Sequence, residues 1–413
     1  MSRRSKPLPD MPLLSWGDQL RAQKAHRRML RRRAVCVAIG CAFVLGSTLF
    51  DPAPDEASCA LRRRFEQLSG PTMAKSLEDT LFYRDARFVA LNEVGGAPDA
   101  FGLSVDEFHA HAELRARTQP HGLLATQTHD AKRGEDVRAR LAALSHDPQT
   151  WRALFAAAPA PERPDANDRS LLLQTFIGAW PAHGASGAPP APDATTLARF
   201  QAYARKALRE SKRRTSWRAP NAAYEDAARR WIEQLCAHDG FLEELALRLP
   251  ALARAGDRVS LARTALKLVI PGVPDIYQGC EGADFSLVDP DNRRPVDYAR
   301  RMRLMETGGR GFEACKFALV RTLLADRKQS PDLYAFGDYE PLAAPKGWIG
   351  FRRSHGAEAL LAAIRLAPFA HTPPPGWAMA DAQWRNLLRE VAFPHANGEA
   401  ASPPAIVLKA AQR

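Results

Sequence analysis

The amino-acid sequence predicts a mixed α/β body with a large helical segment, followed by a small β-rich domain. Two short apolar runs, 122–127 and 275–279, have the length of buried strands and end in polar residues. Between them, from about residue 132 to residue 270, apolar side chains recur at helical spacing. After about residue 330, short apolar runs are separated by Gly and Pro, which is typical of a small sheet.

The composition is that of an ordinary globular protein. The chain has 413 residues, of which 46% are hydrophobic and 25% charged, enough for roughly two or three domains. Its six Cys form no Cys-x-x-Cys pair and no Cys/His cluster with zinc spacing. We therefore expect free thiols in a reducing compartment such as the cytoplasm, with no metal and no cofactor.

The basic charge is concentrated at the N-terminus. Residues 1–64 hold 13 Lys and Arg against 5 Asp and Glu, so they carry +8 of the net charge of +12. A protein that binds nucleic acid presents its basic patch on the folded body. The charge distribution therefore does not predict nucleic-acid binding.

Residues 34–50 form an uncharged, mostly apolar segment directly behind Arg31–Arg33. Seventeen residues is at the lower limit for crossing a bilayer, and the arginines would keep the N-terminus cytoplasmic. The segment also resembles the core of a cleaved signal peptide, although its charged leader is too long. A third interpretation is a non-functional leader read from an unrelated upstream start. The sequence leaves these open, so the expected location is cytoplasmic or, alternatively, anchored to a membrane through 34–50.

Helix starts can be predicted in the middle of the chain. Asp193 and Asn221 each precede an apolar helix face and suit the N-cap position. A third helix, 260–270, should stop at Pro271-Gly272, and the apolar run after residue 84 is also predicted to be helical. Aromatic residues on these faces indicate a helix core more than a platform for a ligand; they are Phe200, Tyr203, Tyr224 and Trp231.

The residues that could carry chemistry follow the two predicted strands. The first strand leads into His129, Asp130, Lys132 and Arg133, and the second leads into the set Tyr277, Glu281 and Arg293. Polar side chains just past strand ends are what a β/α barrel places in its active site. An Asp beside a His and a Lys can stay ionised and stabilise a developing cation. A helix-capping Asp with a neighbouring His is the alternative explanation.

Six ordered blocks of sequence resemble the C-terminal half of malto-oligosyltrehalose synthases, which are members of the α-amylase superfamily. They begin near Arg62, and the last 100 residues resemble the family only loosely. The blocks are GPTMAKSLEDTLFYR (70–84), ALNEVGG (90–96), THDAKRGEDVRARL (128–141), TSWRAPNAAYE (215–225), PGVPDIYQGCE (271–281) and DFSLVDPDNRRPVDY (284–298).

The resemblance implies an α/β fold: the C-terminal part of a (β/α)8 barrel, about strands six to eight, with a large helical insertion and a small C-terminal β domain. The implied domains are a basic leader (1–61), strands six and seven of the barrel (62–131), the helical insertion (132–256), strand eight with its following loop and helix (257–325), and the β-rich domain (326–413).

Members of this family are isomerases of trehalose biosynthesis. They convert the reducing-end α-1,4 linkage of a maltodextrin into an α,α-1,1 linkage by intramolecular transglucosylation. By resemblance, Asp130 is the carboxylate that stabilises the transition state, and His129 binds sugar hydroxyls beside it. Lys132 and Arg133 match positions near the acceptor glucose. The pathway partner implied is a maltooligosyltrehalose trehalohydrolase.

Three departures from the family pattern affect the expected function. The nucleophile and the acid/base of the retaining mechanism have no counterpart in this sequence, so we expect the lone chain to be inactive. Activity would then need a companion chain that carries the N-terminal barrel half. Ser76 and Asp85 replace a Gly and a Tyr, and 280–283 replaces Thr-Glu-Leu-Trp, which puts sugar stacking there in doubt. The rival hypotheses are a maltodextrin-binding remnant and a membrane-tethered scaffold.

Overall fold

The computed structural model describes residues 55–182, 191–369, 372–379, 381, 383–393 and 403–410. The chain falls into two units, residues 1–75 and 76–413, and each is described by itself. The apolar segment 34–50 and its three interpretations lie outside the described residues. In the part of the chain that is described, no helix combines the length and apolar character needed to cross a membrane.

The first unit is described only at its end, where α2 (Glu56–Met73) forms a long helix. Its N-cap is Asp55, whose carboxylate accepts a hydrogen bond from the backbone N–H of Ser58 at 2.8 Å. A short π-helical turn, Ala74–Glu78, follows directly.

The second unit begins with irregular chain rather than the helix predicted after residue 84. Only two 3₁₀ turns form, at Leu81–Tyr83 and Val89–Leu91. The reason is tertiary hydrogen bonding: the Val89 N–H donates to the Gln174 side chain, and the Asn92 side chain donates to backbone carbonyls of residues 82 and 85. These bonds satisfy the backbone that a longer helix would have paired within itself.

Two predicted strands pair in parallel, although most of the helices separate them in the sequence. β1 (Leu123–Ala125) lies beside β2 (Val273–Asp275), with Leu123 opposite Val273. The second strand overlaps the predicted segment 275–279 only at Asp275, because Gly272, at φ +128°, turns the chain directly out of the preceding helix and the strand begins at Val273. A Cβ at Gly272 would lie 2.7 Å from the Leu124 side chain, so the turn requires glycine. The helix before β1 is α3 (Val105–Thr118).

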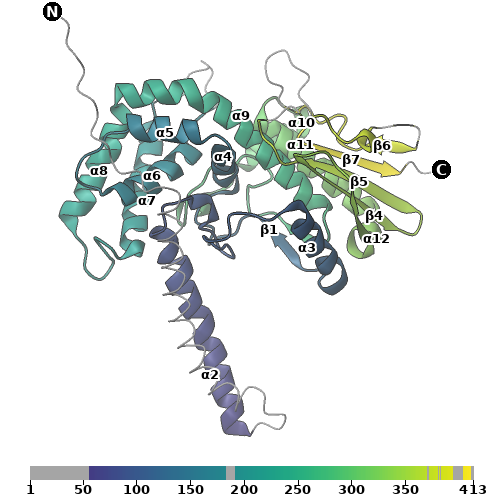
Figure 1. Ribbon diagram of the computed structural model, residues 1–413, viewed down its shortest axis with the longest axis horizontal. Helices are drawn as coiled ribbons and strands as arrows, with labels where there is room; N and C mark the ends of the chain where they lie inside the picture. The colour runs from purple at the N-terminus through teal and green to yellow at the C-terminus, as the bar shows by residue number, and fades with distance from the viewer. Residues whose placement is uncertain are drawn as a thin grey trace, which may run out of the picture. The chain divides into compact units, whose positions relative to one another are not determined.

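The helices between the strands build the larger core, as the apolar periodicity predicted (Figure 1). Asp193 caps α7 and Asn221 caps α8, which confirms both predicted N-caps. Phe176 stacks on Phe200 with ring centroids 4.3 Å apart, and Trp231 lies in the same cluster. The helices are α4 (Glu135–Ser145), α5 (Pro148–Ala157), α6 (Ala166–Ala179), α7 (Ala194–Ser211), α8 (Ala222–Ala237) and α9 (Asp239–Val269).

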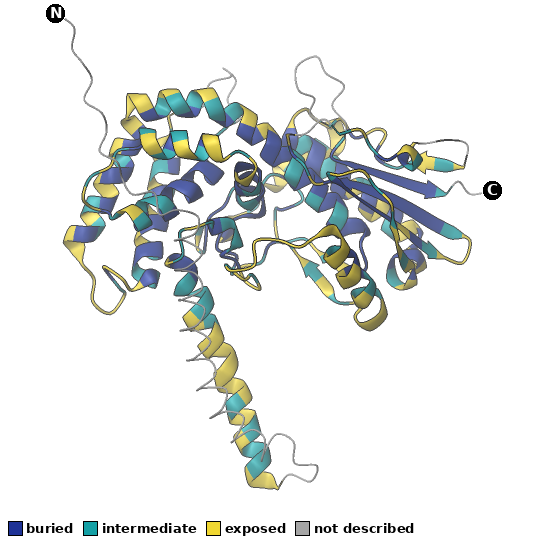
Figure 2. Cartoon of the chain, viewed as in Figure 1, coloured by how far each residue is buried: buried dark blue, intermediate teal, exposed yellow. Residues whose placement is uncertain are grey.

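The last part of the chain forms the expected small sheet, which is antiparallel with strand order β3-β4-β5-β7-β6. The long helix α9 packs against α4, α11 and β5, and a second apolar core fills the space between α9, α11 and the sheet, where the buried residues gather (Figure 2). The elements are α10 (Tyr298–Thr307), α11 (Phe312–Gln329), α12 (Pro331–Phe336), β3 (Asp338–Leu342), β4 (Trp348–His355), β5 (Glu358–Arg365), β6 (Trp384–Asn386) and β7 (Ala405–Ala410).

Candidate active site

The segments that follow β1 and β2 come together beyond the two strands. Arg133 forms an antiparallel bridge with Leu287, and the Gly134 N–H donates to the Ser286 carbonyl at 2.7 Å. A Cβ at Gly134 would lie 2.8 Å from that carbonyl oxygen, so only glycine permits this approach. The pairing places the residues after each strand, which the sequence singled out separately, in one region of the fold.

Asp130 is held by a buried lysine that it shares with a second carboxylate. Lys132 Nζ donates to Asp130 Oδ1 at 2.9 Å and to Asp79 Oδ1 at 3.0 Å. The Lys132 side chain is 1% exposed, that of Asp79 is 21% exposed and that of Asp130 is 47% exposed. Burial lowers the pKa of Lys132, but the hydrogen bonds and charges of the two carboxylates outweigh it, so the net pKa is raised. The ammonium therefore stays charged, and the Asp130 carboxylate beside it still reaches solvent.

Glu93 fixes the backbone of the same turn. Its carboxylate accepts the Lys132 N–H at 2.9 and 3.0 Å and the Arg133 N–H at 3.2 Å. It also lies 3.5 Å from the Arg138 guanidinium. Charge-assisted bonds to backbone N–H groups are stronger than neutral ones. Glu93 therefore fixes the position of the Lys132 backbone, from which the lysine side chain extends toward Asp130. Sequence reasoning missed both Glu93 and Asp79, although each lies inside one of the family-like blocks.

Arg133 points into the protein rather than toward solvent. The residue is 0% exposed. Its guanidinium donates to Thr175 Oγ1 at 2.9 Å, to the Tyr203 hydroxyl at 2.9 Å, and to the carbonyls of Val89 and Asn92 at 3.2 and 3.3 Å. These bonds tie the turn after β1 to helices α6 and α7, so in this structure the Arg133 side chain has a structural role.

His129 is exposed, and its backbone carbonyl accepts a hydrogen bond from the Asn292 side chain at 3.0 Å. This bond links the turn after β1 to the loop after β2. The His129 side chain itself makes no hydrogen bond among the described residues, so its ring is available to a ligand.

The candidate residues after β2 form a separate set. Arg301 donates to the Glu281 carboxylate at 2.7 Å and to the Gly279 carbonyl at 2.9 Å. Arg293 is paired with Asp289, and Tyr277 is partly buried, which raises the pKa of its phenol. Throughout the described residues, no hydrogen bond or ion pair joins these three candidates to Asp130 or to His129.

A buried charge network lies next to the site and was not predicted. Lys316, on α11 and fully buried, donates to Glu135 at 2.6 Å and to Asp136 at 2.9 Å. Burial lowers the pKa of Lys316, but the charges of Asp136 and Glu135 outweigh it, so the net pKa is raised. Burial likewise raises the pKa of Glu135, but the charges of Lys316 and two further cations outweigh it, so the net pKa is lowered. Asp136 also accepts the Asp284 N–H at 2.7 Å. The network therefore locks the start of α4 to α11 and to the loop after β2.

The Cys280 thiol is buried and donates to the Asp284 carboxylate at 3.2 Å, and burial first and Asp284 second raise its pKa strongly. Such a thiol is a poor nucleophile. Among the residues whose placement is described, no group of three or more His, Cys, Asp and Glu side chains could hold a metal ion.

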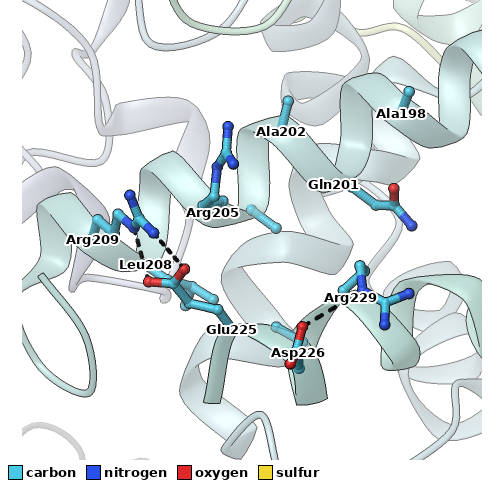
Figure 3. Close-up of a pocket in the computed structure, with 11 residues that line it drawn as sticks. Ala198, Gln201, Ala202, Arg205, Leu208, Arg209, Glu225, Asp226 and Arg229 are labelled. Carbon is cyan, nitrogen blue, oxygen red and sulfur yellow. Dashed lines mark hydrogen bonds and ion pairs between the residues drawn. The ribbon is translucent and has the colours of Figure 1, made fainter. Parts of the chain in front are cut away.

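The block 215–225 packs the helical region rather than the site. Arg209 and Glu225 form a two-point ion pair at 2.8 and 2.7 Å across a groove of about 400 Å³ between α7 and α8 (Figure 3). Thr215 donates to the same carboxylate at 2.6 Å, and the Trp217 ring centroid lies 4.9 Å from the Arg209 guanidinium carbon. These contacts show that the block 215–225 packs helices α7 and α8 together.

Two curated proteins that are similar to this chain carry the same name. Two strains of Mycobacterium tuberculosis, CDC 1551 / Oshkosh and H37Rv, have a protein named "Putative maltooligosyl trehalose synthase" that is 39% identical over 339 residues. That match covers 79% of this chain and 42% of the relative. This chain thus spans less than half the length of the curated relatives it matches. No family model matches the sequence.

Solved structures give the same result. The maltooligosyltrehalose synthase of Arthrobacter ramosus is 32% identical with a TM-score of 0.71, over 92% of this chain and 50% of that one. The hypothetical maltooligosyl trehalose synthase of Sulfolobus tokodaii is 28% identical with a TM-score of 0.70, over 86% of this chain and 47% of that one. The resemblance indicated by the sequence blocks is confirmed: the chain is homologous to part of the maltooligosyl trehalose synthases.

Proposed function

We propose that this chain is one part of a malto-oligosyltrehalose synthase and contributes Asp130 to the conversion of a reducing-end α-1,4 linkage into an α,α-1,1 linkage. The supporting observation is the Asp130 carboxylate, held by the buried Lys132 ammonium yet about half exposed. A maltodextrin is the proposed substrate. A maltooligosyltrehalose trehalohydrolase would act on the product, and the free thiols of Cys236, Cys280 and Cys315 suit a cytoplasmic location.

β1 and β2 would be the seventh and eighth strands of a (β/α)8 barrel. Their parallel pairing across a long helical connection supports this assignment. So does the position of the candidate residues, because Asp130 and Tyr277 both follow the C-terminal end of their strand. Active sites of such barrels lie at this end.

The proposed role of Asp130 is electrostatic. Cleavage of a glycosidic bond passes through a transition state with oxocarbenium character. A fixed carboxylate stabilises the positive charge that develops on the sugar. Lys132 and Asp79 hold this carboxylate in place, and the exposed His129 ring next to it would bind hydroxyls of the same sugar.

The remaining catalytic groups would come from another polypeptide. A retaining mechanism needs a nucleophile and an acid/base about 5–5.5 Å apart. Asp79, which shares the Lys132 ammonium with Asp130, is engaged in that ion pair. We therefore assign neither role to this chain and place both on the companion that carries the first barrel strands.

The test is to incubate the purified chain with maltopentaose and to analyse the products for a non-reducing oligosaccharide. We expect none from the chain alone and turnover when the companion is added. Binding of maltopentaose with no turnover in the mixture would instead favour a sugar-binding remnant. Turnover by the lone chain would contradict the assignment of the missing carboxylates.

A further inference from the structure

One face of the β1–β2 pair is open to solvent and mostly apolar, with one carboxylate, Asp275, at its end. Leu123 is 73% exposed and Val273, its partner across the pair, is 39% exposed. Ala125 and Asp275, the next residues on the same face, are also exposed. An open Leu–Val pair on a sheet face is unusual because large apolar side chains at adjacent positions normally cover each other or a neighbour.

The opposite face is covered by the chain itself. Leu124 and Pro274 point there, and Gly272 approaches the Leu124 side chain so closely that no Cβ fits. Ile276, just after β2, and Phe108 on α3 pack against the apolar core shared by α9 and α11. The β1–β2 pair is therefore covered on one face and exposed on the other.

Parallel strands are almost always buried on both faces and belong to sheets of several strands. The sheet formed by β1 and β2 contains only these two strands in the described part of the chain. The outer edge of β1 presents backbone N–H and C=O groups that can bond a further strand. On the outer edge of β2, Pro274 offers only its C=O. The exposed face and the open edge of β1 both fit an occupant that is itself made of parallel strands.

We propose that this face, defined by Leu123, Ala125, Val273 and Asp275, is the docking surface for a second polypeptide that supplies parallel strands. This inference rests on the proposed function, since it names the surface through which the companion would bind. The occupant is identified from the comparisons: the matched region covers 42% of the M. tuberculosis relative and 50% of the A. ramosus structure. The part of those proteins that this chain does not match is the polypeptide that fits.

Docking at this face also brings the partner to the site. Ala125 ends β1 only five positions before Asp130, so strands added beside β1 and β2 would end near that carboxylate. The missing nucleophile and acid/base would then reach the same sugar. Because the added strands would run parallel to β1 and β2, docking at this surface would also place their C-terminal ends beside Asp130.

The experiment mixes the full chain with a separately purified polypeptide, the part of the A. ramosus enzyme that this chain does not match. Complex formation is measured by light scattering and by sedimentation over a concentration series. We expect a one-to-one complex. Hydrogen exchange should show new protection of the backbone amides of Leu123 and Ala125, which point away from β2 in the parallel pair.

Two variants on the face and one matched control locate the contact. Leu123→Lys and Val273→Lys should each weaken the complex at least tenfold, because each buries a charge in an apolar interface. Leu247→Lys changes a leucine of nearly equal exposure, 72%, in the first half of α9, 26 positions before Val273, and should leave the affinity unchanged. Circular dichroism and melting curves confirm that all three variants are folded.

Five outcomes decide between the proposals. No complex, no new protection at Leu123 and Ala125, or equal affinity of the face variants and the control would each overturn the docking surface. Self-association of the chain that Leu123→Lys abolishes would assign the face to a second copy and overturn it as well. A complex that depends on Leu123 but does not turn over maltopentaose would keep the docking surface and refute the proposed function.

Discussion

Lys132 Nζ lies 2.9 Å from Asp130 Oδ1, and the lysine is 1% exposed while the aspartate side chain is 47% exposed. One end of this ion pair is therefore fixed in the protein interior and the other faces solvent. Asp79 and Glu93 complete the arrangement by bonding the ammonium and the backbone of Lys132. This geometry suits a carboxylate that must be ionised, fixed and accessible at once.

Lys132→Met should destabilise the protein by about 1–3 kcal/mol, because Asp79 and Asp130 would lose a buried charged hydrogen-bond donor. Equilibrium unfolding in urea measures the change. Lys346→Met, at an exposed lysine, is the control and should stay within about 0.5 kcal/mol of the parent. Equal stability of the Lys132 variant and the control would show that the ion pair contributes nothing.

Arg133→Lys should cost about 3 kcal/mol or more, although it conserves the charge. A lysine cannot reproduce the planar guanidinium that bonds Thr175, Tyr203 and two carbonyls, and it would leave these groups unpaired in the interior. The melting temperature and the yield of soluble protein report the loss. An unchanged melting temperature would contradict the structural role and return Arg133 to the candidates for substrate binding.

Asp257 should make the protein less stable as the pH rises from about 4 to about 7. Burial raises the pKa of its carboxyl to about 7, and the Arg140 charge only partly opposes this. In that window the folded protein keeps the proton and the unfolded chain does not, so stability falls with pH. Asp257→Asn should remove this slope, worth up to about 4 kcal/mol. Urea unfolding at several pH values tests it, and parallel slopes for both proteins would contradict it.

Glu93→Gln should loosen the turn that carries Asp130 without unfolding the protein. The amide oxygen can still accept one of the backbone N–H bonds of Lys132 and Arg133, but the charge assistance is lost. We expect a loss of about 1–2 kcal/mol and faster hydrogen exchange at 130–133. Unchanged exchange at these amides would show that Glu93 does not hold the turn.

The sequence predicts those features that depend on local pattern. Asp193 and Asn221 are recognisable as N-caps because a short polar side chain precedes an apolar helix face. The strand around Leu124 is recognisable from a short apolar run between turn residues, whereas the observed second strand shares only Asp275 with the predicted segment 275–279.

Features set by distant residues could not be read from the sequence. Arg133 carries the same charge as an exposed binding residue, and only the position of Tyr203 and Thr175 shows that it points inward. The lysine shared by Asp79 and Asp130 joins segments 51 positions apart, and Lys316 meets Glu135 across 181 positions. The local sequence around each of these residues does not predict the contacts.

The most direct test of the central claim compares the chain and its Asp130→Asn variant, each mixed with the companion polypeptide and maltopentaose. The measured quantity is the rate at which reducing ends disappear. We predict that the variant binds the companion as tightly as the parent but turns over at least about a thousandfold more slowly, because the transition state loses its charge partner. An Asp130→Asn mixture as fast as the parent mixture would contradict the account.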